Sequence, residues 1–130
     1  MKKKNALKSL LDYINGTNFK KVNLIGKSLG ATVSSYFLND LPPEEQKRYS
    51  ITVLGYTLND IDLKNFIGKI TIIQGDLDRY GDISKVKDDM KQAISQDIAY
   101  IPIPNADHSY RNPETKEPLY EDETISKINL

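Results

Sequence analysis

Four short apolar segments, separated by stretches with helical periodicity, constrain the fold of this chain more than any other feature. They cover residues 22–25, 51–54, 70–73 and 98–101. Each is rich in β-branched residues and bounded by Gly, Pro, Asn or Asp, which is typical of strands. Because the segments are nearly continuous rather than alternating, they suit strands that are covered on both faces.

Helical patterns precede, separate and follow these segments. An apolar stripe at helical spacing predicts a first helix that ends at Asn15–Gly16, formed by Ala6, Leu7, Leu10, Leu11 and Ile14. A second helix is expected over 28–38, with four side chains facing inward: Leu29, Val33, Tyr36 and Phe37. Further helices are expected from Pro42, over 82–95 and over 118–128.

The alternation of strands and helices predicts the fold class. It indicates an α/β three-layer sandwich, with a mainly parallel sheet of about four strands, right-handed crossovers and helices on both faces. Ligands of such sheets bind at the carboxyl ends of the strands. With 130 residues and no visible linker or repeat, we expect a single domain over residues 1–130.

Composition excludes several classes of function. The 18 basic and 18 acidic residues balance, so nothing in the net charge favours nucleic acid or an anionic membrane as partner. The chain has no cysteine, which excludes disulfides, thiolate nucleophiles and cysteine metal sites. No apolar run approaches the roughly 18 residues of a membrane span, and no signal peptide is visible. We therefore expect a cytoplasmic protein.

The stretch VNLIGKSLGA, residues 22–31, contains two overlapping motifs. Its Gly-Lys-Ser suggests a phosphate-binding P-loop, but that motif needs a glycine where Lys21 stands, and a loop where 22–25 reads as strand. The same residues satisfy G-x-S-x-G through Gly26, Lys27, Ser28, Leu29 and Gly30, in the required strand–turn–helix context. A turn with Ser28 as a helix N-cap explains these five residues equally well.

Two further strand ends carry polar groups. Gly75-Asp76-Leu77-Asp78 follows the third apolar segment, and Asn105-Ala106-Asp107-His108-Ser109 follows the fourth. A carboxylate and the only histidine of the chain therefore fall at the sheet edge that carries Ser28. Their order along the chain is Ser, Asp, His.

With these motifs the chain resembles the C-terminal half of an α/β-hydrolase, from the nucleophile elbow onward. Residues 26–30 match the elbow, 75–78 are similar to the G-x-x-D after the family's seventh strand, and 106–110 resemble its histidine loop. The four segments then correspond to the family's fifth to eighth strands. Within the family, the chain resembles small members similar to dienelactone hydrolases and carboxylesterases.

The resemblance implies a serine hydrolase that acts on a carboxylic ester or related acyl bond. Ser28 would be the nucleophile, His108 the general base and acid, and Asp78 the carboxylate that orients the imidazole. The backbone amide of Leu29 would donate to an oxyanion. No metal or organic cofactor is required. Asp76 is the nearest alternative acid, and Asp60 a more distant one.

Other residues near the strand ends have two interpretations each. Lys27 could contact an anionic substrate, but is more simply a packing or surface residue. Tyr56, Tyr80 and Tyr110 either line a pocket or pack in the core or at its rim. Acidic strand ends at Asp76, Asp78 and Asp82 form a poor ligand set for a cation.

The resemblance also leaves parts of the family fold without a counterpart. The family's first four strands and the loop that supplies a second oxyanion donor find no match in residues 1–21, and only residues 55–69 stand where larger relatives insert a lid. We therefore expect a minimal or truncated fold without a lid, whose first strand is a free apolar edge. Such an edge recruits partners, which predicts a homo-oligomer or a partner chain covering it, such as the other half of a split hydrolase. A catalytically impaired binding or assembly module is the alternative function.

Overall fold

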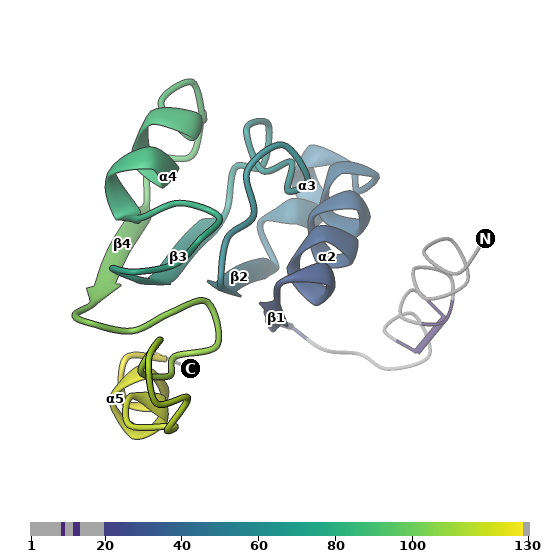
Figure 1. Ribbon diagram of the computed structural model, residues 1–130. Helices are drawn as coiled ribbons and strands as arrows, with labels where there is room; N and C mark the ends of the chain where they lie inside the picture. The colour runs from purple at the N-terminus through teal and green to yellow at the C-terminus, as the bar shows by residue number, and fades with distance from the viewer. Residues whose placement is uncertain (1–8, 10–11, 14–19, 129–130) are drawn as a thin grey trace.

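The computed structural model describes residues 9, 12–13 and 20–128. Element labels follow Figure 1, and the bounds are β1 Val22–Lys27, α2 Leu29–Asn39, α3 Pro43–Gln46, β2 Tyr49–Leu54, β3 Lys69–Gly75, α4 Ile83–Asp89, β4 Ile98–Ile103 and α5 Glu121–Ser126. All four expected strands are present, each longer than its apolar segment by two or three residues. The five residues of the expected N-terminal stripe lie outside the described residues.

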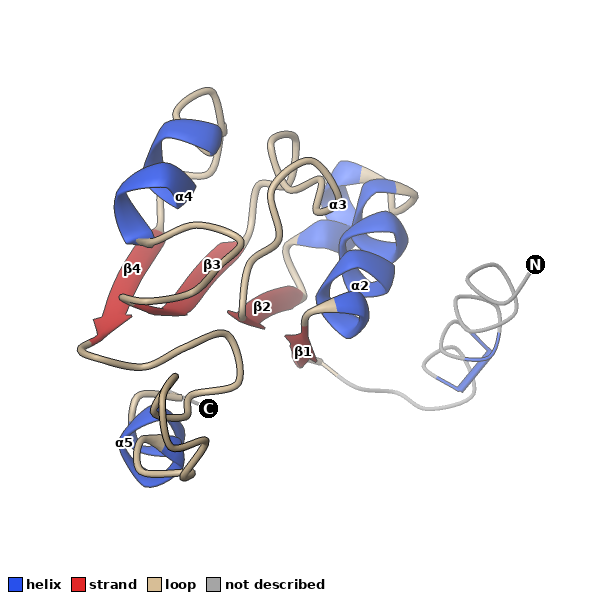
Figure 2. Cartoon of the chain, viewed as in Figure 1, coloured by secondary structure: helices blue, strands red, loops and turns tan. Residues whose placement is uncertain are grey.

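The four strands form one parallel sheet in the order β1-β2-β3-β4 (Figure 2). Leu24 lies opposite Ile51, Ile51 opposite Ile70, and Ile70 opposite Ile98. Since all strands run in the same direction, their carboxyl ends share one edge, as the alternating pattern predicted. In this sheet β1 and β4 are the outer strands.

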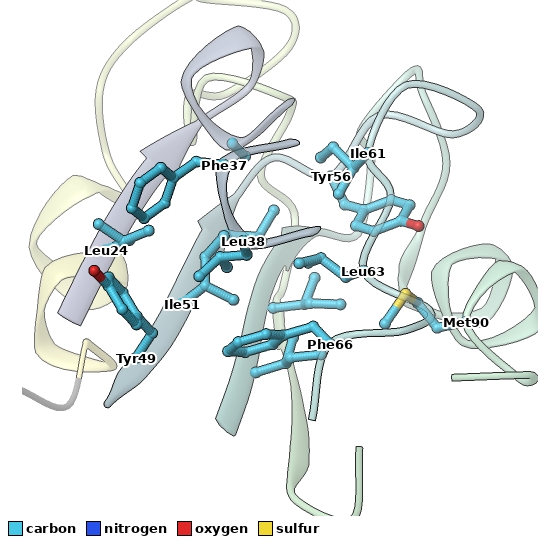
Figure 3. Close-up of a cluster of buried hydrophobic side chains, with 14 of the residues drawn as sticks. Leu24, Phe37, Leu38, Tyr49, Ile51, Tyr56, Ile61, Leu63, Phe66 and Met90 are labelled. Carbon is cyan, nitrogen blue, oxygen red and sulfur yellow. The ribbon is translucent and has the colours of Figure 1, made fainter. Parts of the chain in front are cut away.

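Helices cover both faces of the sheet, which confirms the expected three layers. In Figure 1, α2, α3 and α4 lie on one side of the sheet and α5 lies on the other. The larger core fills the first side, and its labelled members in Figure 3 include Phe37 and Leu38 of α2 and Ile51 of β2. A smaller core on the α5 side is built on Ile73 and Ile103. Within the described residues, no helix is long and apolar enough to cross a membrane.

Three helices differ from the sequence prediction, and of these α5 covers only 121–126 of the expected 118–128. In α2 the expected inward positions Leu29 and Tyr36 are 62% and 36% exposed, because the helix buries the stripe of Ala31, Ser35 and Leu38 instead. Ala31 passes close to Gly26 of β1, and the Ser35 hydroxyl accepts from the N–H of Asp62 at 3.1 Å. Helix α4 ends at Asp89 instead of continuing to residue 95.

The segment after α4 forms contacts that a continuing helix could not make. The backbone N–H of Ile94 donates to Lys64 O at 2.9 Å, and the Ser95 hydroxyl donates to Gly68 O at 2.6 Å. Both acceptors lie between β2 and β3, so this segment is tied to the connection 55–68. That connection buries Tyr56, Leu63 and Phe66 in the larger core (Figure 3), so it covers the sheet rather than forming a lid.

Candidate active site

Ser28 lies in the turn between β1 and α2, in a backbone conformation that serine rarely adopts. Its φ and ψ angles are 51° and −112°. The N–H of Ser28 donates to Leu54 O at 2.9 Å, and its carbonyl accepts from Ala31 N–H at 3.0 Å. Ser28 occupies the N-cap position of α2, but its side chain makes no capping hydrogen bond. The N-cap interpretation therefore does not explain the hydroxyl, which is directed elsewhere.

The two glycines of the turn meet different surroundings. A Cβ added at Gly26 would lie 2.6 Å from the backbone N and Cα of Ala31, closer than real contacts allow. A Cβ at Gly30 would meet no described atom within 4 Å. The close approach that the motif implies is thus present at Gly26, where β1 passes under the first turn of α2, and is absent at Gly30.

Three side chains from distant parts of the sequence meet at the carboxyl edge of the sheet. The Ser28 Oγ lies 3.3 Å from His108 Nε2, and His108 Nδ1 lies 2.7 Å from Asp78 Oδ2. A carboxylate only accepts hydrogen bonds, so this pairing places the imidazole proton on Nδ1. Nε2 is then free to accept the hydroxyl proton of Ser28, which is the arrangement of a general base beside a nucleophile.

Asp78 is held by further hydrogen bonds. Its Oδ1 accepts from the backbone N–H of Tyr80 at 2.8 Å, and its Oδ2 accepts from Gln74 Nε2 at 3.2 Å. Asp78 is only 7% exposed, whereas the alternative acids Asp76 and Asp60 are exposed. Of the three carboxylates, only Asp78 has a hydrogen bond to the imidazole among the described residues.

Gln74 and Gly55 also shape the site, and the sequence analysis identified neither. Fully buried in β3, Gln74 donates to Tyr56 O and Gly81 O at 3.1 and 2.7 Å, which joins the loop of Asp78 to the end of β2. Gly55 follows β2 with φ 73°, and a Cβ there would lie 2.7 Å from His108 Cε1. The available signals were a lone amide in the apolar strand ITIIQG, and a glycine directly after ITVL.

The loop that carries His108 is anchored on both sides of the histidine. Ala106 O accepts from Leu77 N–H at 2.9 Å, and the hydroxyl of Tyr110 donates to Ile73 O at 2.5 Å. Burial raises the pKa of Tyr110, so the phenol stays protonated and keeps this bond. Tyr110 itself has φ 60°, which is an uncommon value for an aromatic residue.

The remaining sequence candidates divide between core and rim. Tyr56 and Tyr110 are buried, while Tyr80 is 42% exposed and sets its ring edge-on to His108 with centroids 4.7 Å apart. Lys27 is exposed and, with residues of α5, borders a pocket of about 170 Å³. Leu29 is the first residue of α2, so its N–H lies in the turn where no intrahelical acceptor exists. No group of three His, Asp or Glu residues suited to a metal ion occurs among the described residues.

Comparisons with known proteins show which family the chain resembles. A family model described as an alpha/beta hydrolase domain matches residues 2–129. No curated protein matches the chain significantly. Three solved structures share the fold at 14–19% identity: an alpha-beta serine hydrolase homologue from Coxiella burnetii, a predicted CIB-like hydrolase from Thermoplasma acidophilum and the alpha/beta hydrolase enzyme MGS-MChE2 from a sediment metagenome of the Mar Chica lagoon, Morocco.

The similarity to these structures extends over nearly the whole chain. For the Coxiella protein the TM-score is 0.64 at 19% identity, with 92% of this chain and 52% of that chain covered. For the Thermoplasma protein it is 0.64 at 15% identity, covering 95% and 55%. For the metagenomic enzyme it is 0.65 at 14% identity, covering 96% and 68%. The chain thus spans little more than half the length of the first two, and by its sequence and its parallel sheet it belongs to the α/β-hydrolase family.

Proposed function

We propose that this protein is a serine hydrolase that cleaves a carboxylic ester or related acyl bond. The observation that carries the proposal is the hydrogen-bonded chain Ser28–His108–Asp78, which begins at a serine in a strained turn whose hydroxyl is not used for capping. Strained backbone conformations persist only where the surrounding fold maintains them, and they cluster at active sites. Membership of a hydrolase family supports the same conclusion.

The proposed reaction follows from the order of these groups. His108 takes the proton of the Ser28 hydroxyl through Nε2 as Oγ attacks the acyl carbon. Asp78 keeps Nδ1 protonated and stabilises the imidazolium that forms. His108 then returns the proton to the leaving oxygen, and water hydrolyses the acyl-enzyme by the same steps. The N–H of Leu29, at the positive end of the α2 dipole, would stabilise the negative charge on the acyl oxygen.

A fluorophosphonate probe tests the proposal, since it labels only an activated serine. Purified wild-type protein should label stoichiometrically, and both Ser28→Ala and His108→Ala should abolish labelling. Ser109→Ala is a matched control, because it removes a hydroxyl next to His108 that has no place in the proposed chain. An unlabelled but folded wild-type protein, judged by its circular dichroism, would contradict the proposal.

A second candidate function rests on β1. This strand is an outer strand of the described sheet, and the side chain of its residue Ile25 is 45% exposed. Outer strands with apolar side chains pair readily with other strands, so we propose that a second chain covers β1 and that the domain also serves in assembly. Analytical ultracentrifugation tests this: a monomer at all concentrations, unchanged by Ile25→Lys, would refute it, whereas dissociation by that substitution supports it.

A further inference from the structure

A pocket of about 330 Å³ lies directly beside the candidate histidine. It is bordered by Leu77 and Arg79 from the loop after β3, and by six residues of the loop after β4: Asp107, His108, Ser109, Arg111, Pro113 and Lys116. The pocket therefore lies between the loop that carries Asp78 and the loop that carries His108. Ser28 does not border it, so the pocket lies on the His108 side of the proposed reaction centre.

The charged side chains that line this pocket are mostly basic. Arg79, Arg111 and Lys116 contribute three positive charges, against one negative charge from Asp107. Oδ1 of Asp107 accepts from the backbone N–H groups of Ser109 and Arg111, both at 2.9 Å. The ion pairs found among the described residues are Arg48–Glu45, Lys91–Asp88 and His108–Asp78, so none of the three pocket cations has a carboxylate partner there.

These cations are carried by backbone that is already ordered. Arg111 O accepts from Asp107 N–H at 2.9 Å, which ties Arg111 to the residue before His108. Lys116 has φ 63° and closes a turn in which its N–H donates to Asn112 O at 2.8 Å. The guanidinium of Arg79 lies 4.8 Å from the centre of the Tyr80 ring, and that ring contacts His108 edge-on. Backbone that is ordered before binding loses less conformational entropy when a ligand binds, which favours affinity.

The chemistry of the proposed reaction says which part of a substrate meets this pocket. When the acyl carbon bonds to Ser28 Oγ, the bond from that carbon to the leaving oxygen breaks, and the leaving oxygen takes its proton from His108 Nε2. A general acid must lie within hydrogen-bond reach of the atom it protonates. The leaving group therefore lies against His108, and what extends beyond its oxygen reaches toward the pocket.

We propose that the pocket binds an anionic group on the leaving alcohol or phenol of the substrate, with Arg79, Arg111 and Lys116 as the specificity-determining residues. This inference rests on the proposed hydrolase function. Planar guanidinium groups suit a carboxylate or a phosphate, because they offer two parallel N–H donors. The protein is thus an esterase for esters whose alcohol or phenol carries an anionic group. The leaving group that it releases is anionic in addition to the carboxylate formed from the acyl part.

Two aryl acetates test the inference: 4-acetoxybenzoate, whose leaving group is anionic, and its neutral methyl ester. The measured quantity is the anionic-to-neutral ratio of kcat/KM, since any general effect of a substitution on catalysis cancels in that ratio. Arg111→Gln should lower the ratio about three- to fivefold, the upper range for exposed ion pairs. The double variant Arg79→Gln/Arg111→Gln should lower it about tenfold or more, and added salt should weaken the preference of the wild type.

Lys69→Gln is the matched control, because it removes the same charge at the opposite end of β3 and should leave the ratio unchanged. A ratio that is unaffected by both arginine variants would overturn the inference. A second substrate pair, monophenyl succinate and phenyl butyrate, carries its charge on the acyl side instead. If the arginine variants change that ratio rather than the first one, the assignment to the leaving group is wrong.

A binding measurement separates the failure of this inference from the failure of the proposed hydrolase function. The product 4-hydroxybenzoate and its methyl ester are titrated by NMR into Ser28→Ala protein, with and without Arg111→Gln. Tighter binding of the anion that depends on Arg111 supports the pocket, even where no ester is hydrolysed and the proposed function fails. Equal binding of both compounds overturns the assignment of the pocket to an anionic group, even where Ser28 of the wild-type protein is fully labelled by the fluorophosphonate.

Discussion

Gly55 packs so closely against the imidazole of His108 that a single methyl group added there should displace it. In Gly55→Ala the new Cβ would lie 2.7 Å from Cε1, 3.1 Å from Nδ1 and 3.4 Å from Nε2 of His108. Carbon atoms pack favourably at about 3.5–4.0 Å, so the ring must retreat by roughly 0.8–1.3 Å. The two contacts at risk are the 2.7 Å bond to Asp78 and the 3.3 Å approach to Ser28.

The expected loss follows from that displacement. A misplacement of about 1 Å at a reacting group can cost about 100-fold in rate, so we expect the rate constant of fluorophosphonate labelling to fall by about that factor. Stability should fall less. An alanine at the φ of 73° found at Gly55 costs about 1–2 kcal/mol, which lowers the melting temperature by several degrees but leaves the chain folded.

Gly81→Ala is the control for backbone strain at a positive φ without a clash against His108. Gly81 also has a positive φ, of 132°, but a Cβ there would meet Lys85 Cβ at 3.3 Å and Leu58 Cδ1 at 3.5 Å, not His108. Labelling rates are measured below the melting temperatures of both variants. If Gly55→Ala labels at the wild-type rate, or if Gly81→Ala loses as much as Gly55→Ala, the packing of His108 on Gly55 does not position the imidazole.

Three further predictions concern the carboxylate, the turn and the buried phenols. Asp78→Asn should keep the fold but slow labelling by about three to four orders of magnitude, because the amide favours the wrong imidazole tautomer; unchanged labelling would exclude Asp78 from the role. Gly26→Ala should lower the free energy of unfolding by about 1–3 kcal/mol in urea titrations through its clash with Ala31, whereas Gly30→Ala should not destabilise. Burial raises the pKa of Tyr56 and of Tyr110. Their stabilising effect is therefore complete below pH of about 10 and is lost above it, by up to about 1.4 kcal/mol per pH unit for each phenol. Tyr110→Phe should flatten that fall in urea titrations at alkaline pH, and an equally steep fall in the variant would contradict the assignment.

The strands, the sheet and the meeting of three side chains could be predicted from sequence because each depends on local patterns. A β-branched run bounded by turn residues forms a strand with few alternatives, and parallel order brings all strand ends to one edge. Ser28, Asp78 and His108 each directly follow such a run or lie a few residues beyond it. Parallel topology was therefore sufficient to predict that Ser28, His108 and a carboxylate share this edge, whereas the choice of Asp78 over Asp76 and Asp60 rested on the resemblance to the family's G-x-x-D.

Helix ends and helix faces were less predictable, because they depend on contacts made elsewhere. Residues 90–95 continue the helical pattern of α4, but the hydrogen bonds of Ile94 and Ser95 to the 55–68 connection prevail over it. In α2 the small side chains Ala31 and Ser35 are buried, while the larger Leu29 is 62% exposed. Hydrophobicity predicts which residues prefer burial, but the position of the helix on the fold decides which face is buried, and here that face includes Phe37 and Leu38 as well as the small residues.

Three residues with strained backbone near the site show why it needs the rest of the sheet. Ser28, Asn105 and Tyr110 all have positive φ, and all lie at or within three residues of a member of the proposed triad. Such conformations cost about 1–3 kcal/mol each, somewhat less for asparagine, and persist only where neighbouring structure determines them. Two of the three are anchored to central strands, since Ser28 N–H donates to Leu54 O and the Tyr110 hydroxyl donates to Ile73 O. Because β2 and β3 supply both acceptors, a substitution that loosens these two strands should release the strain and separate Ser28 from His108 before the domain unfolds.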